Sequence, residues 1–115
     1  MDRASDRFAL ADGNFIPCLG FGTYLIDDPI VAYRSVADAL ELGYRHIDTA
    51  AIYRNEESVG KAVRDSGLAR GDIFVTSKVW ASEHGYDRAS RAIDASLKRL
   101  GLDYMDMCLI HWPAN

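Results

Sequence analysis

The stretch that decides the fold reads Gly43-Tyr44-Arg45-His46-Ile47-Asp48-Thr49-Ala50-Ala51-Ile52-Tyr53-Arg54-Asn55-Glu56-Glu57-Ser58-Val59-Gly60. It predicts the end of a helix at Gly43 and a short apolar strand that finishes at Asp48. A loop carrying Tyr53 follows, and a second helix begins at Asn55. β/α proteins place their chemistry where a strand ends and the following loop begins. The rest of the chain is therefore expected to supply partners for this carboxylate and this phenol.

Composition and charge narrow the class of protein. The chain has 115 residues, enough for one domain, and its 49% hydrophobic and 26% charged residues are typical of a folded protein. A net charge of −4 without a cluster of Lys and Arg argues against nucleic-acid binding. No apolar run approaches the roughly 20 residues that span a bilayer, and the N-terminus lacks the apolar core of a signal peptide. Neither a membrane nor a nucleic acid is an expected partner.

The two cysteines, Cys18 and Cys108, both lie in apolar runs and have no metal-ligand spacing between them. Two buried free thiols are therefore expected rather than a disulfide, and no metal site is predicted. Free thiols suit a reducing cytoplasm, which is the predicted location.

Hydrophobic periodicity and turn residues divide the chain into strands and helices. Asp12-Gly13 favours a tight turn in a hairpin over residues 8–16. Asp28-Pro29 is a helix start, because a carboxylate can cap the first turn and proline lacks only an N–H that this turn leaves unused. The predicted helices run from there to about Leu42, from an Asn55 cap to just before Gly67, and from near Asp87 to Gly101. The predicted strands span residues 18–22, 44–48, 72–80 and 104–110.

Strands that alternate with helices at this spacing form parallel sheets with helical crossovers. A doubly wound sheet and a (β/α)₈ TIM barrel both fit the alternation. Gly20-Phe21-Gly22 is too short for a dinucleotide fingerprint and opens no helix, so nothing resembles a Rossmann motif. A barrel has eight strands in about 250 residues. With a hairpin, four parallel strands and three helices, residues 1–115 are predicted to be one domain of the α/β class, the first half of such a barrel.

Polar side chains follow all four predicted parallel strands, where a barrel opens its active-site mouth. Lys78 ends an apolar strand, and a charged amine there needs a counter-ion, for which Asp48 on the neighbouring strand is suitable. A structural ion pair is the alternative interpretation. Tyr53 near this amine favours catalysis, since a phenol with a pKa of about 10 becomes a useful proton donor when an ammonium stabilises its anion. His111 could donate a hydrogen bond to a substrate oxygen, or it could be a core histidine.

Three aromatic side chains could form the apolar walls of a substrate pocket at the same mouth. They are Tyr24, Trp80 and Trp112, and packing in the core or at the rim is the alternative for each. His46 and Asp106 are expected to have no part in the chemistry.

These motifs resemble the aldo-keto reductase family. The resemblance is carried by residues 43–50 with Tyr53 and residues 55–57, by Ser77-Lys78-Val79-Trp80, and by Leu109-Ile110-His111-Trp112-Pro113. It implies an NADPH-dependent oxidoreductase that reduces small aldehydes, ketones or keto-sugars. Hydride would pass from NADPH to the carbonyl carbon while Tyr53 protonates the oxygen. Lys78, held by Asp48, would lower the pKa of this phenol, and His111 would orient the carbonyl.

The resemblance also implies a cofactor site, formed by Gly22, Thr23, Tyr24 and Asp48. Tyr24 stands where many relatives carry tryptophan, and it is also an expected wall of the substrate pocket. Family members add four further strands, which hold most of the cofactor contacts. The 115 residues alone are therefore expected to be inactive or nearly so, and their open sheet edges to favour self-association or a complementary C-terminal half.

Two other functions remain open. The chain could be a non-catalytic binding or structural relic that keeps the four residues by descent. It could also be a Schiff-base lyase, with Lys78 as the nucleophile on a barrel strand.

Overall fold

A computed structural model describes residues 3, 5–80 and 85–111. The strands within these residues are β1 (Arg7–Ala9), β2 (Phe15–Pro17), β3 (Phe21–Gly22), β4 (His46–Asp48), β5 (Phe74–Trp80) and β6 (Met107–His111). The α-helices are α1 (Pro29–Glu41), α2 (Glu56–Asp65) and α3 (Tyr86–Leu100), and the 3₁₀ helices are η1 (Ala51–Tyr53) and η2 (Arg70–Asp72). The predicted order of hairpin, strands and helices is confirmed.

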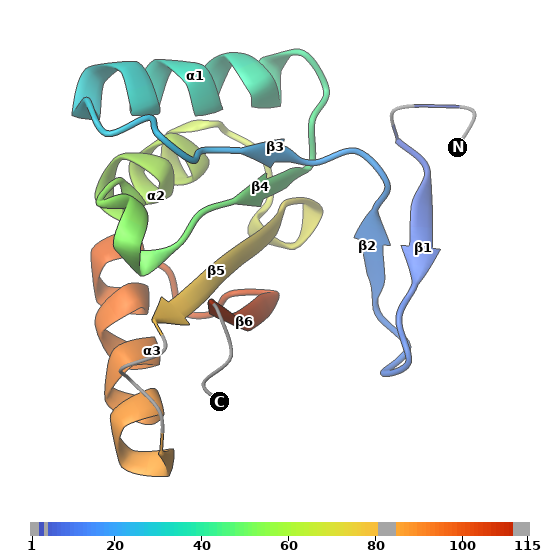
Figure 1. The fold of residues 1–115 in the computed structure, drawn as a ribbon. Helices are drawn as coiled ribbons and strands as arrows, with labels where there is room; N and C mark the ends of the chain where they lie inside the picture. The colour runs from blue at the N-terminus through green and yellow to red at the C-terminus, as the bar shows by residue number, and fades with distance from the viewer. Residues whose placement is uncertain (1–2, 4, 81–84, 112–115) are drawn as a thin grey trace.

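The four strands β3, β4, β5 and β6 form one parallel sheet in chain order, while β1 and β2 form a separate antiparallel hairpin. Each connection between neighbouring parallel strands contains one α-helix, and Figure 1 shows α1, α2 and α3 following one another along the same side of the sheet. The hairpin lies near the ends at which the parallel strands begin (Figure 1). This is the predicted first half of a (β/α)₈ barrel.

The ends of α1 form as the local sequence predicts. The Asp28 carboxylate accepts hydrogen bonds from the backbone N–H groups of Ile30 and Val31 at 2.9 and 3.0 Å. Gly43 follows the helix with φ of 108°, a left-handed conformation that glycine adopts without steric cost. The chain can therefore turn directly from α1 into β4.

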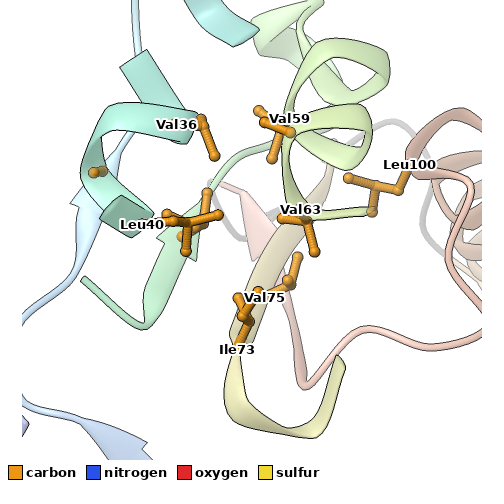
Figure 2. Close-up of a cluster of buried hydrophobic side chains, with 10 residues drawn as sticks. Val36, Leu40, Val59, Val63, Ile73, Val75 and Leu100 are labelled. Atoms are coloured by element: carbon orange, nitrogen blue, oxygen red, sulfur yellow. The ribbon is translucent and has the colours of Figure 1, made fainter. Parts of the chain in front are cut away.

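The hydrophobic core lies between the sheet and the helices. Figure 2 shows side chains from α1, α2, β5 and the end of α3 meeting there. Ile47 and Val75 point into this core, so the alternation of a strand places Asp48 and Lys78 on the other face of the sheet. The fully or nearly fully buried core residues are Val36, Ala39, Leu40, Ile47, Val59, Ala62, Val63, Ile73, Val75 and Leu100.

Replacing Gly60 with alanine is expected to destabilise the fold by about 1–3 kcal/mol. A Cβ atom at Gly60 in α2 would overlap the backbone carbonyl of Leu100, which cannot rotate away as a side chain could. This cost exceeds the gain of up to about 1 kcal/mol from the better helix propensity of alanine. Urea denaturation measures the effect, with Gly71→Ala as control because a Cβ there meets nothing within 4 Å. Equal stability of the two variants would contradict this account of the α2–α3 contact.

Some predictions about the strands and cysteines were wrong. β3 and β4 are shorter than the predicted 18–22 and 44–48, and residues 104–106 precede β6 rather than starting it. There the Asp106 carboxylate accepts from the backbone N–H of Val75 at 2.8 Å and from Arg70 at 2.9 Å, in line with its expected structural role. Cys18 and Cys108 are free, but Cys18 is half-buried and Cys108 is exposed on the edge strand β6.

Among the described residues, no helix combines the length and the apolar character that crossing a bilayer requires.

Candidate active site

An ion pair joins the ends of β4 and β5. The Lys78 ammonium lies 2.9 and 2.7 Å from the two carboxylate oxygens of Asp48 and 3.1 Å from the backbone carbonyl of Thr49. The parallel register brings these residues together, because Asp48 pairs with Thr76 and Lys78 lies one step further along the same face of β5. The side chains keep 14% and 30% of their surfaces exposed, so the pair faces an open mouth rather than the core.

Tyr53 reaches this ion pair from η1. Its hydroxyl lies 3.4 Å from Nζ of Lys78, and the same Nζ lies 5.0 Å from the centre of its ring. The turn is closed by the backbone N–H of Tyr53, which donates to the carbonyl of Ala50 at 3.0 Å, and by Arg54 in a left-handed conformation. Sequence reasoning predicted only a loop here. The 3₁₀ turn directs the phenol back over the strand ends.

Aromatic rings surround the phenol. The His111 ring meets Tyr53 edge to face at a centroid distance of 5.7 Å and meets Trp80 in the same way at 5.4 Å. The Tyr24 ring also lies close to that of Tyr53, at a centroid distance of 5.4 Å. Lys78, Tyr53, Asp48 and His111 thus lie at one rim, as expected from their positions at strand ends. Trp112, a predicted pocket wall, lies outside the described residues.

The residues predicted to hold a cofactor lie beside this rim, but they differ in accessibility. Gly22 pairs with Asp48 and is exposed, and Tyr24 is 66% exposed. Thr23 is completely buried, and its hydroxyl donates to the backbone carbonyl of Asp48 at 3.0 Å. The Thr23 hydroxyl therefore ties the end of β3 to β4. Contacts of these residues with a cofactor stay a prediction.

Asn55 does not cap α2 with its side chain, so that part of the sequence prediction was wrong. It is 3% exposed, and its amide bonds instead to the loops that follow β3 and β4. Asparagine is favoured both as a cap and in loop hydrogen bonding, and nothing in the local sequence separates the two uses.

A second ion pair lies on the opposite, helix-facing side of β5. Glu56 is 2% exposed; its carboxylate accepts from Nε of Arg99 in α3 at 2.7 Å and from the hydroxyl of Ser77 at 2.7 Å. Ser77 alternates with Lys78 along the strand, so this pair lies on the opposite face of β5 and does not reach the mouth. Sequence reasoning assigned Glu56 only to the positive end of the α2 dipole. A partner 43 residues away could not be predicted from local spacing.

His46 lies on the mouth side of β4 but below the ion pair, where its Nε2 is 2.9 Å from the hydroxyl of Thr76. Its ring packs edge to face against Phe74 at 5.0 Å. Burial lowers the pKa of His46 below its ordinary value of 6.5, an effect partly opposed by the nearby Asp48 carboxylate. This lowered pKa favours the neutral form of the His46 ring, which lies below the ion pair.

Stability is expected to fall as the pH drops below about 6.5, partly because of His46. Below about pH 6.5 the His46 imidazole binds a proton more readily in the unfolded chain than in the folded one. The contribution of His46 to the free energy of unfolding is therefore complete above this pH. It declines as the pH falls towards the lower pKa of the folded state. His46→Gln should flatten the dependence of the free energy of unfolding on pH between about 7 and 5. Urea titrations at several pH values measure the slope. Identical slopes for both proteins would show that His46 is not the responsible group.

The arrangement at the rim can polarise and protonate an oxygen. The phenol is a proton donor, the ammonium beside it can stabilise the phenolate that remains, and the imidazole edge is within reach of the same space. A groove of about 930 Å³ lies at the other end of the sheet, between the hairpin and the strand starts, and its lining includes none of these four residues.

Comparison with known proteins identifies the family. The model of the Aldo/keto reductase family matches residues 18–115. The glycerol 2-dehydrogenase (NADP(+)) of Saccharomyces cerevisiae is 54% identical over 107 residues, which are 93% of this chain and 33% of the relative. The crystal structure of an aldo/keto reductase from Brucella melitensis has a TM-score of 0.91 at 53% identity, covering 96% of this chain and 43% of that one.

A third similar protein, a Bombyx mori aldo-keto reductase crystallised in complex with NADP, has a TM-score of 0.89 at 41% identity, over 96% of this chain and 39% of that one. The chain thus spans 33–43% of the length of these three proteins. Both the motifs at the rim and the order of strands and helices fall within the matched part. The chain belongs to the aldo/keto reductase family.

Proposed function

We propose that this chain carries the acid–base machinery of an NADPH-dependent oxidoreductase that reduces aldehydes, ketones or keto-sugars to alcohols. The supporting observation is the distance of 3.4 Å between the Tyr53 hydroxyl and an ammonium that Asp48 holds with both carboxylate oxygens. A structural ion pair alone would not need a phenol at that point. The names of the yeast and silkworm relatives, which mention NADP, favour this cofactor.

The residues present fit a nicotinamide cofactor in their chemistry. A bound NADPH would be the source of the hydride, and the carbonyl oxygen would need one proton and a nearby positive charge from the protein. Tyr53 gives the proton from its hydroxyl, and the Lys78 ammonium stabilises the phenolate left behind. Asp48 keeps the ammonium in place, and His111 orients the carbonyl oxygen. Gly22, Tyr24 and Asp48 would hold the cofactor on the β3 side of the rim, whereas Thr23, predicted from the resemblance to join them, is completely buried and would act through its hydrogen bond to the Asp48 carbonyl.

Substrate would enter over the aromatic side chains of the rim. Tyr24, Trp80 and His111 supply apolar surface around the phenol, and Trp80 itself is 36% exposed. Such surface suits the carbon skeleton of a small carbonyl compound. Trp112 is proposed as a further wall from the sequence pattern alone. The free thiols agree with the cytoplasm as the proposed location.

A chimera tests this function directly. The matched part of the Brucella melitensis reductase is replaced by this chain, and NADPH oxidation is followed with small aldehydes and ketones. Reduction at a rate within about tenfold of the parent is expected, because the proximity of donor, acceptor and acid is retained. A folded chimera that binds NADPH but reduces nothing would favour the non-catalytic alternative. The 115-residue chain alone is expected to turn over slowly at most, since in the relatives more than half of the chain lies outside the matched part.

The lyase alternative gains no support from the site. A Schiff base forms from a neutral amine with a free lone pair. The contacts of the Lys78 amine are with a carboxylate, a backbone carbonyl and a phenol, an arrangement that three N–H donors satisfy. We therefore propose reduction rather than lyase chemistry.

The 115-residue chain is expected to associate with itself or with a complementary half. Within the described residues, the edge strands β3 and β6 each pair on one side only, and Leu109 and Ile110 of β6 are 43% and 57% exposed. Unpaired strand edges with apolar side chains favour association. Sedimentation velocity at micromolar concentration measures it. A single monomeric boundary would count against this expectation.

A further inference from the structure

The buried amide of Asn55 joins the loops that carry the residues of the rim. Its Nδ2 donates to the backbone carbonyls of Thr23 and Ile26 at 2.9 and 3.0 Å, and its Oδ1 accepts from the hydroxyl of Thr49 at 2.6 Å. The Thr23 hydroxyl is 3.5 Å from the same oxygen but donates to the nearer carbonyl of Asp48. Two carbonyl acceptors fix which end of the amide is the nitrogen.

Two of these hydrogen bonds, those with Thr23 and Thr49, lead to residues of the proposed site. Thr23 directly precedes Tyr24, whose ring lies 5.4 Å from that of Tyr53. Thr49 supplies the backbone carbonyl that accepts from Lys78 at 3.1 Å. Asn55 itself follows Tyr53 by two residues, after the left-handed Arg54. One side chain thus connects the phenol, the aromatic wall and the segment that holds the ammonium.

The Asn55 side chain joins these loops instead of capping helix α2. Asn55 precedes the first turn of α2, where an asparagine side chain normally accepts a hydrogen bond from a backbone N–H of that turn. It makes no such bond here. Because the amide is almost completely buried, its loss would leave the carbonyls of Thr23 and Ile26 without this donor.

We propose that Asn55 is a positioning residue for carbonyl reduction, which holds Tyr24, Tyr53 and Lys78 in one arrangement. Its chemical consequence rests on the proposed function, whereas the arrangement itself can be measured without any turnover. Asn55 touches neither substrate nor cofactor in this account. It acts through the two loops that it joins.

The test is nuclear magnetic resonance of the 115-residue chain with selectively labelled tyrosine and lysine. The wild-type chain should show cross-peaks between the rings of Tyr24 and Tyr53, and between the Lys78 side chain and the Tyr53 ring. Asn55→Ala is expected to lose both sets. Thr49→Val removes only the hydroxyl that donates to Asn55, so it should weaken the Lys78–Tyr53 cross-peaks and leave the Tyr24–Tyr53 set.

Ser77→Ala is the matched control, because it removes one buried hydrogen bond on the opposite face of β5 and should keep all cross-peaks. A folded Asn55→Ala chain with wild-type cross-peaks would overturn the proposal. If that variant does not fold, unchanged Lys78–Tyr53 cross-peaks in Thr49→Val would overturn it instead. Failure of the chimera to reduce carbonyls, with the expected cross-peak losses, would refute the proposed function but leave the positioning role intact.

Discussion

Replacing Tyr53 with phenylalanine is expected to lower the rate of carbonyl reduction by the chimera about 100- to 10,000-fold, the range typical of a positioned general acid. The ring and its contacts with Tyr24 and His111 would remain, while the hydroxyl 3.4 Å from the Lys78 ammonium would be lost. Steady-state kinetics measure kcat and KM. The loss should lie in kcat, because the hydroxyl acts when the oxygen receives its proton.

The chain offers a matched control in Tyr33. Its hydroxyl donates to the Asp65 carboxylate at 2.8 Å, in a contact between α1 and α2 that involves none of the four rim residues. Tyr33→Phe removes the same atom from a hydrogen-bonded phenol and should leave kcat near the value of the unmodified chimera. Equal kcat values for the Tyr53→Phe and Tyr33→Phe chimeras would rule out Tyr53 as the proton donor.

Replacing Arg99 with methionine is expected to destabilise the fold by about 3 kcal/mol, the lower end of the range for breaking a buried ion pair. The Glu56 carboxylate, now 2% exposed, would keep the Ser77 hydroxyl as its one hydrogen-bond partner among the described residues. The lower end applies because the Arg99 side chain is 39% exposed, so water can reach part of the vacated space. A folded domain is stabilised by about 5–15 kcal/mol in total, and such a loss is large.

Two further variants separate the ion pair from other effects of the substitution. Arg91→Met changes an exposed arginine on the same helix and should alter stability by no more than about 0.5 kcal/mol. Glu56→Gln in the Arg99→Met background removes the unpaired charge and should recover most of the loss. Urea denaturation measures all three proteins. No recovery in the double variant would mean that the cost arises from lost packing of the arginine stem.

The sequence alone predicted the order of elements and the membership of the rim. The signals for α1 are local: its hydrophobic residues recur at helical spacing, Asp28 caps its start and Gly43 follows its end. The helix and its ends were therefore predicted correctly. The carboxyl ends of parallel strands share one edge, so the position of Asp48 and Lys78 at strand ends sufficed to bring them together. The spaced motifs around Asp48, Lys78 and His111 also predicted the aldo/keto reductase family, whose model matches residues 18–115.

Only the tertiary structure decided how polar groups away from the strand ends are used. Asn55 could cap a helix or join loops, and the choice depends on carbonyls 29 and 32 residues away that no local pattern reports. The ion pair between Glu56 of α2 and Arg99 of α3 likewise joins residues distant in sequence, and no local pattern reports it. The exposure of Cys108 likewise depends on which strand forms the edge of the sheet. Local sequence determines backbone conformations and the alternation of side chains between the two faces of a strand. Which hydrogen-bond partners distant in sequence come together depends on how the helices and strands pack.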